Sequence, residues 1–472
     1  RGSRRAGYFG DKRAVYAAAV ETLAELERRQ PGRGWGDRAL AIVQRAKERD
    51  LLDAFGAGRR PAPPQSAAAL RKRVGAGAVL EYFLGESNLY LWAIRRDGVR
   101  FHDLGPPRPV LDAVAAVHRA LAHSEEPPAA DLAALSRVLL GAAGPLPQGD
   151  APLRIAPDGA LHYLPFELLA DSGGFLVEKS AVSYLPSASA LAGLGGPEPV
   201  RAGGVRLLGF GDPLLARPGE TAESPRGLLI ERFALAPLPA AAVELEAVQR
   251  QLGGRSALFT GGRATERAFR AAVSRGARVV HLATHAVIDE RPGRGAAILL
   301  SPEAGEDGLL SPAEIAGLDD RSDLTVLAAC RTALGPGENG QALASLTGAF
   351  LAAGSRAIVA TLWDVGDAAT AAFMEQFYWE LSRGLTPAEA LAEAKRRLRA
   401  DPRWRRPALW AGYVLIGDAP PVVPRPLWRQ GWIWIGGAAL VLLLTAAAWW
   451  RRSTGSGSSR SAASAGSSVP AG

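Results

Sequence analysis

Leu324-Thr325-Val326-Leu327-Ala328-Ala329-Cys330 is an apolar run that ends in the only cysteine of the 472-residue chain. A similar apolar run upstream is closed by His285. Short buried strands that end in a thiol and in an imidazole would place a nucleophile and its base at the carboxyl edge of a parallel sheet. The alternative is that Cys330 is a small core residue, because free cysteine is among the most buried residue types, and that His285 is a satisfied polar group.

The sequence around these runs alternates between strand and helix patterns. Continuous apolar strands are predicted at residues 206–211, 277–283, 324–329 and 357–362, with helices at 240–252, 265–274, 342–353 and 368–381. This alternation predicts an α/β fold in which a parallel sheet is covered by helices on both faces. Upstream, three alternating segments at 79–84, 88–94 and 99–102 predict an antiparallel meander at the edge of the sheet.

The composition limits the classes of protein to which this chain can belong. Apolar residues make up 48% of the chain, which is enough for a sizeable core in two or three units. The net charge of +8 comes from arginines scattered along the chain, so we expect no nucleic-acid partner. A single cysteine excludes an internal disulfide framework and a cysteine-based zinc site, and it favours a reducing compartment.

The first 60 residues read as a helical hairpin. Two helices are predicted at 13–29 and 38–55, separated by a Pro-Gly turn. Such a hairpin cannot bury its apolar faces alone, so it is interpreted as the last unit of a helical-repeat array of the tetratricopeptide type. A proline-rich linker is expected at 61–76. Because the chain begins with Arg1 and not Met, we expect a fragment or a processed product.

The last 54 residues predict a membrane anchor. Residues 431–450 contain no charge and would cover about 30 Å of hydrocarbon as a helix. Tryptophans flank this segment at both ends, as expected at the two interfaces of a bilayer. The sequence thus predicts a linker at 419–430, a single transmembrane helix at 431–450 and a flexible tail at 451–472. We expect a single-pass membrane protein whose catalytic domain lies in the cytoplasm.

Several competing enzyme classes are excluded. The chain has no G-x-S-x-G elbow of serine hydrolases and no G-x-x-x-x-G-K-[ST] phosphate loop. His281 and His285 are four residues apart, but the glutamate of a zinc-protease helix is missing between them and the segment reads as a strand. We therefore predict no metal and no cofactor, and a structural role for His281.

Several blocks of sequence resemble the CHAT domain, a group of caspase-like cysteine peptidases often joined to tetratricopeptide repeats. The blocks are Val280-His-Leu-Ala-Thr-His285, Asp307-Gly-Leu-Leu-Ser-Pro-Ala-Glu-Ile, Ala328-Ala-Cys330-Arg-Thr-Ala, Val359-Ala-Thr-Leu-Trp-Asp-Val and Trp410-Ala-Gly-Tyr-Val-Leu-Ile-Gly-Asp418. With Pro157-Asp-Gly-Ala-Leu-His-Tyr-Leu-Pro165 upstream, the resemblance covers residues 77–418. It implies an N-terminal pseudo-catalytic part at 77–235 and a catalytic part at 236–418.

The resemblance also implies a mechanism. Cys330 would be the nucleophile that attacks a peptide carbonyl, and His285 the base that accepts its proton and then protonates the leaving amine. By the same analogy, the backbone amides of Cys330 and Ala286 would stabilise the oxyanion. Many caspase-like enzymes have glycine at the position of Ala286, so that donor departs from the usual pattern.

Candidate substrate-binding residues follow from the same comparison, the first being Asp364 together with its neighbour Trp363. Asp364, directly after Trp363, occupies the place from which caspases line the first specificity pocket, and a carboxylate there would favour Arg or Lys before the scissile bond. The alternative for Asp364 is a helix-capping or solvated aspartate. Asp158 is a second candidate, although Asp158-Gly159 alone is a plain turn signal.

The sequence as a whole predicts a membrane-anchored, repeat-linked cysteine endopeptidase of the CHAT type from a bacterium. Its expected partners are a protein substrate, a protein regulator bound through the helical repeats, and a membrane at residues 431–450. The alternative from another class is a caspase-like signalling scaffold with little or no turnover. A third alternative is a latent enzyme in which a partner must order the loops at 289–295 and 335–341.

Overall fold

The computed structural model describes residues 2–55, 63–171, 174–192, 204–216, 224–233, 235–288, 296–328, 341–424 and Thr445. The chain divides into two units, Arg1–Val423 and Pro424–Gly472. Almost all described residues belong to the first unit, and the fold below is that of this unit.

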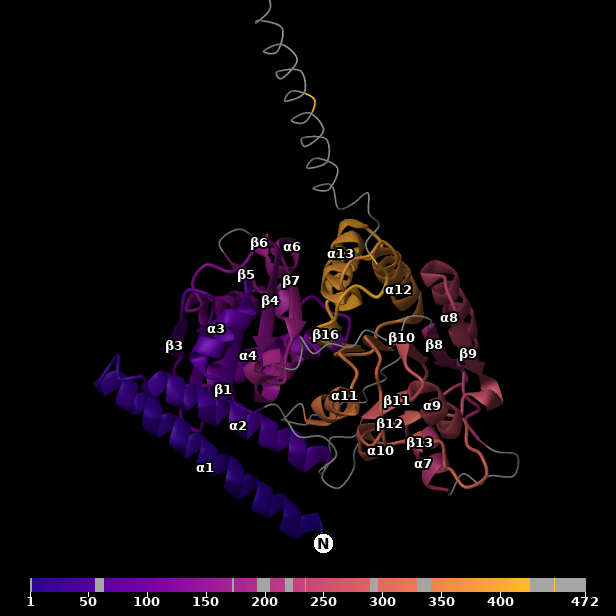
Figure 1. Cartoon of the computed structure of the whole chain (residues 1–472), viewed down its shortest axis with the longest axis horizontal. Coiled ribbons are helices and arrows are strands. Elements are labelled where there is room, and N and C mark those ends of the chain that lie inside the picture. The colour runs from indigo at the N-terminus through magenta and orange to yellow at the C-terminus, as the bar shows by residue number, and fades with distance from the viewer. Residues whose placement is uncertain are drawn as a thin grey trace, which may run out of the picture. The chain divides into compact units, whose positions relative to one another are not determined.

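Eleven strands form one large sheet in the described part of the chain (Figure 1). Their order is β3-β2-β1-β4-β7-β16-β15-β14-β10-β8-β9. In chain order the strands are β1 (Ala78–Leu84), β2 (Leu89–Ile94), β3 (Val99–Asp103), β4 (Gly149–Ala156), β7 (Ser180–Tyr184), β8 (Val205–Gly211), β9 (Ser256–Thr260), β10 (Ala277–Ala283), β14 (Leu324–Leu327), β15 (Ala357–Thr361) and β16 (Tyr413–Gly417). The predicted antiparallel meander is the β1-β2-β3 edge.

The sheet consists of two halves that run in opposite directions. We call β1–β4 and β7 the N-terminal half-sheet, and β8, β9, β10, β14 and β15 the C-terminal half-sheet. Strands β1, β4, β7 and β16 are mutually parallel, as are all five strands of the C-terminal half-sheet. The two sets meet where β15 pairs antiparallel with β16. The carboxyl ends of β4 and β10 therefore lie at opposite edges of the same sheet.

Helices cover both faces of the C-terminal half-sheet, because its strands are apolar on both sides. Figure 1 shows α8 (Pro239–Leu252) and α12 (Asp367–Ser382) above these strands, and α13 (Pro387–Ala400) beside α12 over β7 and β16. On the other face lie α9 (Glu266–Val273), α10 (Pro312–Ala316) and α11 (Gln341–Ala353). Every residue of β14 and β15 is buried between these layers. The predicted α/β architecture is confirmed in this respect.

The N-terminal half-sheet is also covered on both faces, and its alternating side chains sort into two cores. Leu80 and Tyr82 belong to the main core, with α4 (Arg108–Ala122), α5 (Ala129–Leu135) and the π-helical turn Ser136–Leu140. Val79, Phe83 and Trp92 belong to a second core, with α1 (Gly2–Arg29), α2 (Trp35–Phe55) and α3 (Ala67–Val74). The period-2 alternation of a strand explains this division.

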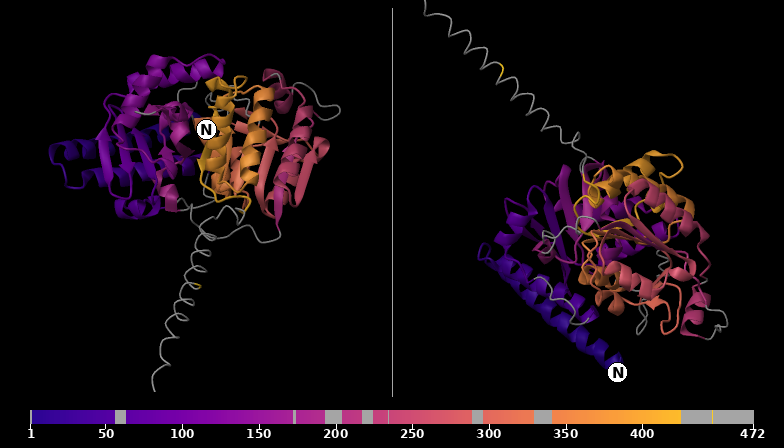
Figure 2. Two further views of the ribbon diagram at one scale, coloured as in Figure 1. Left: turned by 90° about the horizontal axis from the view of Figure 1, so that it is seen from above. Right: turned by 45° about the vertical axis from the view of Figure 1, so that its right-hand side comes forward.

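Helices α1 and α2, which we call the repeat hairpin, run side by side along the second core (Figure 2). Buried ion pairs attach the hairpin to the sheet. The Lys47 ammonium lies 2.5 Å from the Glu81 carboxylate of β1, and it also donates to the carbonyls of Ala156 and Pro157. Helix α2 further contacts α10 and α11 of the C-terminal half. The hairpin therefore contacts both halves of the first unit.

Smaller elements complete the fold. A three-stranded sheet consists of β11 (Ala286–Ile288), β12 (Ala296–Leu299) and β13 (Leu309–Leu310), and β5 (Ala170–Asp171) pairs with β6 (Gly174–Phe175). Two short helices are α6 (Leu176–Lys179) and α7 (Pro225–Arg232).

Two details differ from the predicted organisation. The expected linker at 61–76 contains α3, which begins after Ser66 because its hydroxyl accepts a hydrogen bond from the Ala69 amide. The expected border between the N-terminal and catalytic parts, at residue 235, comes after β8. However, β8 pairs in parallel with β10 and so belongs to the C-terminal half-sheet.

The predicted membrane localisation is corrected. A membrane-spanning helix needs about 20 predominantly apolar residues. In the part of the chain that the structure describes, no helix is both long and apolar enough to cross a bilayer. The two longest of these helices, α1 and α2, carry many charged residues. The single-pass membrane protein and its membrane partner therefore lack support, and residues 431–450 lie outside the described residues apart from Thr445.

Candidate active site

The carboxyl edge of the C-terminal half-sheet carries the predicted base. His285 follows β10, and β14 lies directly beside β10 in parallel. In this register Val279 pairs with Leu324, and the last described residue of the cysteine-bearing run, Ala328, donates its amide to the Leu282 carbonyl at 3.1 Å. Cys330 itself lies outside the described residues.

His285 is held at one ring nitrogen by a backbone carbonyl. The side chain is buried, with 3% of its surface exposed, and Nε2 lies 2.7 Å from the Ala236 carbonyl oxygen. Because a carbonyl only accepts hydrogen bonds, Nε2 carries the proton in this contact. The neutral ring then has its lone pair on Nδ1, which is the nitrogen able to act as a base.

The backbone around His285 is fixed by β12. The Leu299 amide donates to the His285 carbonyl at 2.8 Å, and the Thr284 hydroxyl donates to the Leu299 carbonyl. Ala286 pairs with Ile298 one position further along the antiparallel ladder. Hydrogen-bonded and non-hydrogen-bonded pairs alternate in such a ladder, so the Ala286 amide points away from β12. As β11 is the edge strand of the small sheet, this amide is directed outward from that sheet.

Asp364 lies at the same edge as His285, whereas Trp363 is a core residue. Both follow β15, which is parallel to β14 and β10. Asp364 is exposed. The Trp363 indole is 2% exposed, and its N–H donates to the Ala408 carbonyl at 2.8 Å. Gly412 packs so closely against this ring that a Cβ there would lie 2.8 Å from it. The Trp363 side chain therefore packs in the core at the end of β15.

Asp158 lies at the opposite edge of the sheet. It follows β4, which is antiparallel to β10 and five strand positions away, or about 24 Å. Its carboxylate accepts hydrogen bonds from Arg13 at 2.8 Å and from the Leu84 amide at 2.7 Å. Burial alone would raise the pKa of Asp158, but the charges of Arg13 and Lys47 outweigh it and hold the pKa below 3.8. These contacts attach the repeat hairpin to the sheet.

Replacing Asp158 by asparagine is expected to lower stability and to leave the peptide turnover that the sequence predicts unchanged. The variant loses charge-assisted hydrogen bonds worth about 1.5–3 kcal/mol. Because the folded-state pKa of Asp158 lies below its usual value, its contribution to stability is present above pH 3.8 and lost as the pH falls through the folded pKa. Urea unfolding at pH 7 and reporter kinetics measure the two effects. A tenfold or larger loss of kcat/KM, with the protein still folded, would return Asp158 to the substrate site.

His281 is part of the core, as predicted. It is fully buried, its Nδ1 lies 2.6 Å from the Tyr378 hydroxyl, and its Nε2 lies 3.1 Å from a Glu244 carboxylate oxygen. Within the described ranges, no three histidine, aspartate, glutamate or cysteine side chains are grouped so that they could hold a metal ion.

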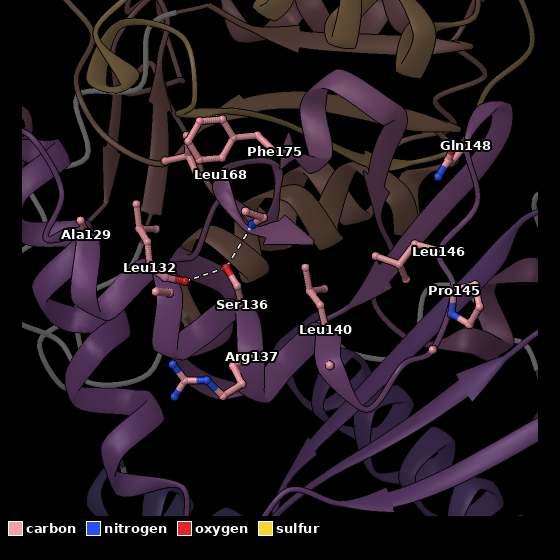
Figure 3. A pocket seen from close by; sticks show the side chains of 14 residues that line it. Ala129, Leu132, Ser136, Arg137, Leu140, Pro145, Leu146, Gln148, Leu168 and Phe175 are labelled. Carbon is pink, nitrogen blue, oxygen red and sulfur yellow. Dashed lines mark hydrogen bonds between the residues drawn. The ribbon is translucent and has the colours of Figure 1, made fainter. Parts of the chain in front are cut away.

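A pocket of about 850 Å³ opens elsewhere, in the N-terminal half (Figure 3). It is lined mainly by apolar residues of α5 and the following π-helical turn, with Leu168 and Phe175 opposite. The Ser136 hydroxyl joins two segments of the pocket wall, because it donates a hydrogen bond to the Leu132 carbonyl and accepts one from the Ala170 amide. None of the predicted site residues lines this pocket.

Comparisons with known proteins agree with the motifs. The family described as CHAT domain matches residues 129–418, which is more than half of the chain. Tetratricopeptide repeat protein 28 of Mus musculus is 26% identical over 311 residues, which cover 55% of this chain and 12% of that protein. Its Homo sapiens counterpart is 40% identical over 74 residues, or 16% of this chain and 3% of that protein. The chain thus spans about an eighth or less of these relatives.

Two solved structures are similar at low sequence identity. The Saccharomyces cerevisiae separase-securin complex matches with a TM-score of 0.48 and 11% identity, covering 81% of this chain and 34% of that one. The Arg-specific cysteine proteinase gingipain R matches with a TM-score of 0.39 and 10% identity, covering 66% and 75%. From the family match over residues 129–418, the chain belongs to the CHAT domain family.

Proposed function

We propose that this protein is a cysteine endopeptidase that cleaves a protein target with Cys330 and His285. The observation that carries the proposal is the register of β10 and β14. Paired residues on these strands differ by 45 in number, as Val279 and Leu324 do, and 330 − 285 is also 45. Cys330 follows Ala328 by two residues, a chain length of at most about 7 Å. This register supports the proposal because the strand that leads toward Cys330 lies directly beside the strand that leads to His285.

The chemistry requires only groups at this edge. The Cys330 sulfur attacks the scissile carbonyl carbon while His285 Nδ1 takes the thiol proton. When the C–N bond breaks, the imidazolium returns that proton to the leaving amine and a thioester remains. Water, deprotonated by His285, then attacks the thioester and releases the acid and the thiol. The Ala236 carbonyl supports each step because it accepts a hydrogen bond from Nε2 and so stabilises the imidazolium.

The outward amide of Ala286 supports an oxyanion site at the same place. It belongs to the residue after His285, and the β11–β12 register turns it away from its own sheet. Together with the Cys330 amide it would donate to the oxygen that becomes negative in the tetrahedral intermediate. The methyl group of Ala286 does not block this role, since the donor is a backbone N–H.

The repeat hairpin supports regulation by a protein partner. Helix α2 contacts α10 and α11, and α11 begins at Gln341, 11 residues after Cys330 in sequence. The relatives named above are tetratricopeptide repeat proteins. A protein that binds the repeats would therefore act on a helix whose preceding segment carries the nucleophile.

Peptide reporters test the proposal. The protein is incubated with reporters that end in Arg, Lys or Asp before the cleaved bond, with and without Cys330→Ala. Turnover that is lost in the variant supports the proposal. Equal turnover by both proteins would discard the dyad, and no turnover by either, with partner proteins included, would favour the scaffold.

Replacing Asp364 by asparagine is expected to weaken selection for a basic residue before the cleaved bond. Asp364 is exposed at the catalytic edge, so a substrate Arg or Lys can pair with it in water-accessible surroundings. Loss of one such charge-assisted bond would lower kcat/KM for Arg reporters about tenfold, mainly through KM. Turnover of a neutral reporter serves as the control. An unchanged Arg preference would show that Asp364 is only a solvated loop residue.

A further inference from the structure

Arg226 is a buried cation that donates hydrogen bonds to five backbone carbonyls. Its exposed fraction is 2%. Nε donates to the Leu215 carbonyl at 2.6 Å, and the other two nitrogens donate to the carbonyls of Leu214, Leu300, Asp307 and Gly308 at 2.7–3.1 Å. A guanidinium has five N–H donors in a fixed plane, which suits it to join several chain segments at one point.

These carbonyls belong to the segments that surround His285. Leu214 and Leu215 follow β8, Leu300 follows β12, and Gly308 precedes β13. Arg226 itself lies in the first turn of α7. One side chain therefore attaches α7 to the small sheet whose first strand begins immediately after His285.

Helix α7 leads directly to the carbonyl that holds the imidazole. Leu235 donates its amide to Ile230 at the end of α7 and packs in a small core with Val287 and Leu299. The next residue, Ala236, accepts the hydrogen bond from His285 Nε2. The path from Arg226 to the imidazole thus consists of one short helix, one buried leucine and one carbonyl.

Gly308 provides the space for the guanidinium. Its φ is +75°, a conformation that side chains rarely adopt, and a Cβ there would lie 2.5 Å from Arg226 Nη1 and 2.5 Å from the Leu300 carbonyl oxygen. Glu266 fixes the same glycine by accepting its amide at 2.7 Å. An alanine at this position would displace the guanidinium without removing its charge.

We propose that Arg226 is a positioning residue, seated against Gly308, that fixes the Ala236 carbonyl and through it the proton on Nε2 of His285. The inference deepens the proposed function. It rests on that function only for the expected effect of the imidazole's orientation on the reaction rate. Without Arg226, α7 keeps its apolar contacts with the small sheet but loses its hydrogen bonds to the Leu300 and Gly308 carbonyls, so the Ala236 carbonyl is held less firmly. His285 then exchanges between its two tautomers, and only one of them has its lone pair on Nδ1.

The tautomer of His285 tests this inference without any turnover. The chain has six histidines, so ¹⁵N-histidine labelling gives few signals, and Cys330→Ala keeps the thiol from contributing. With Arg226 intact, we expect the Nε2-protonated form of His285 at pH 8. In Arg226→Lys we expect a mixture of both tautomers, because a lysine cannot reach all five carbonyls. A single unchanged tautomer in the folded variant would overturn the inference.

Two further variants guard against a general loss of stability. Arg206→Lys is the matched control. Arg206 lies at the start of β8, at the opposite end of this strand from Leu214 and Leu215, and it donates to the Leu252 carbonyl. It should leave the His285 signals unchanged. If Arg226→Lys does not fold, Gly308→Ala carries the same measurement with the charge retained. If folded Gly308→Ala keeps the wild-type tautomer of His285, the proposed role of the contact between Arg226 and Gly308 is rejected.

Kinetic measurements test whether the position of the His285 imidazole affects the rate of the reaction. In the active protein, Arg226→Lys and Gly308→Ala are expected to lower kcat about tenfold or more with KM within about twofold, since a displaced base impairs the chemical step and leaves substrate contacts intact. A proportional rise of KM alone would contradict this. If the wild type shows no turnover, the proposed function fails, yet the NMR result still decides the role of Arg226.

Discussion

Replacing Cys330 by alanine is expected to lower kcat/KM for Arg-ending reporters by about a thousandfold or more, with the fold intact. The thiolate is the attacking group, and no other cysteine in the chain can replace it. His285→Ala should cost about as much, because an unassisted thiol at neutral pH is mostly protonated. Residues that act as a unit are not additive, so the double variant should be no slower than either single variant.

The control for this experiment is His123→Ala. His123 lies at the exposed end of α4, and its ring nitrogen contacts the Arg119 carbonyl in the same helix. This variant removes an imidazole of the same type from the N-terminal half and should keep full activity. If Cys330→Ala and His123→Ala were equally active, the peptidase would have to use another nucleophile, and the proposed dyad would be rejected.

Replacing Lys47 by methionine is expected to cost about 3–5 kcal/mol of stability at pH 7, because it leaves a buried carboxylate without its cation. Glu81 is fully buried, and its carboxylate accepts hydrogen bonds from Lys47 and from the Ala188 amide. Lys47 also donates to two carbonyls at the end of β4, which lose their donor. Urea unfolding, followed by tryptophan fluorescence, measures the effect.

The loss should depend on pH in a direction that identifies Glu81. Burial raises the pKa of Glu81 above 4.5, and removing the nearby Lys47 charge raises it further. A carboxyl group with a raised folded-state pKa costs nothing below pH 4.5 and destabilises increasingly as the pH rises toward the folded value. The difference between Lys47→Met and wild type should therefore shrink below pH 4.5 and be largest at neutral pH.

A compensating substitution provides the control for this variant. In Lys47→Met with Glu81→Gln, the neutral amide still accepts from Ala188 and carries no charge that needs a buried cation. The double variant should regain part of the lost stability and lose the pH dependence. If the double variant is as unstable as the single one at every pH, packing of the Lys47 side chain, and not the uncompensated charge, accounts for the loss.

The strand pattern predicted which strands of the C-terminal half-sheet are neighbours. The apolar runs that end near His285 and Cys330 lie on neighbouring parallel strands, β10 and β14, as their sequence spacing suggested. Such runs are informative because a strand buried on both faces admits few polar residues. Asp364 follows β15, which is parallel to β14, so it lies at the same edge as His285; its role in substrate binding stays a prediction.

The relation between the two halves could not be read from the sequence. Periodicity defines strands but not their order or direction in the sheet, and the single antiparallel β15–β16 pair puts Asp158 at the opposite edge from His285. Trp363 was placed at the correct strand end, but its ring turns into the core because the Ala408 carbonyl and the small Gly412 receive it there. The Ala236 carbonyl leaves no mark in the sequence, because every residue carries a backbone oxygen.

The antiparallel junction at β15 and β16 also affects how this protein can be altered. Because the repeat hairpin is attached at the carboxyl edge of β4 and the proposed chemistry is at that of β10, a library randomised around Asp364 changes no contact of Arg13 or Lys47. If the proposed activity is present, new cleavage preferences could thus be selected at this edge without changing the polar contacts that hold the hairpin to the opposite edge.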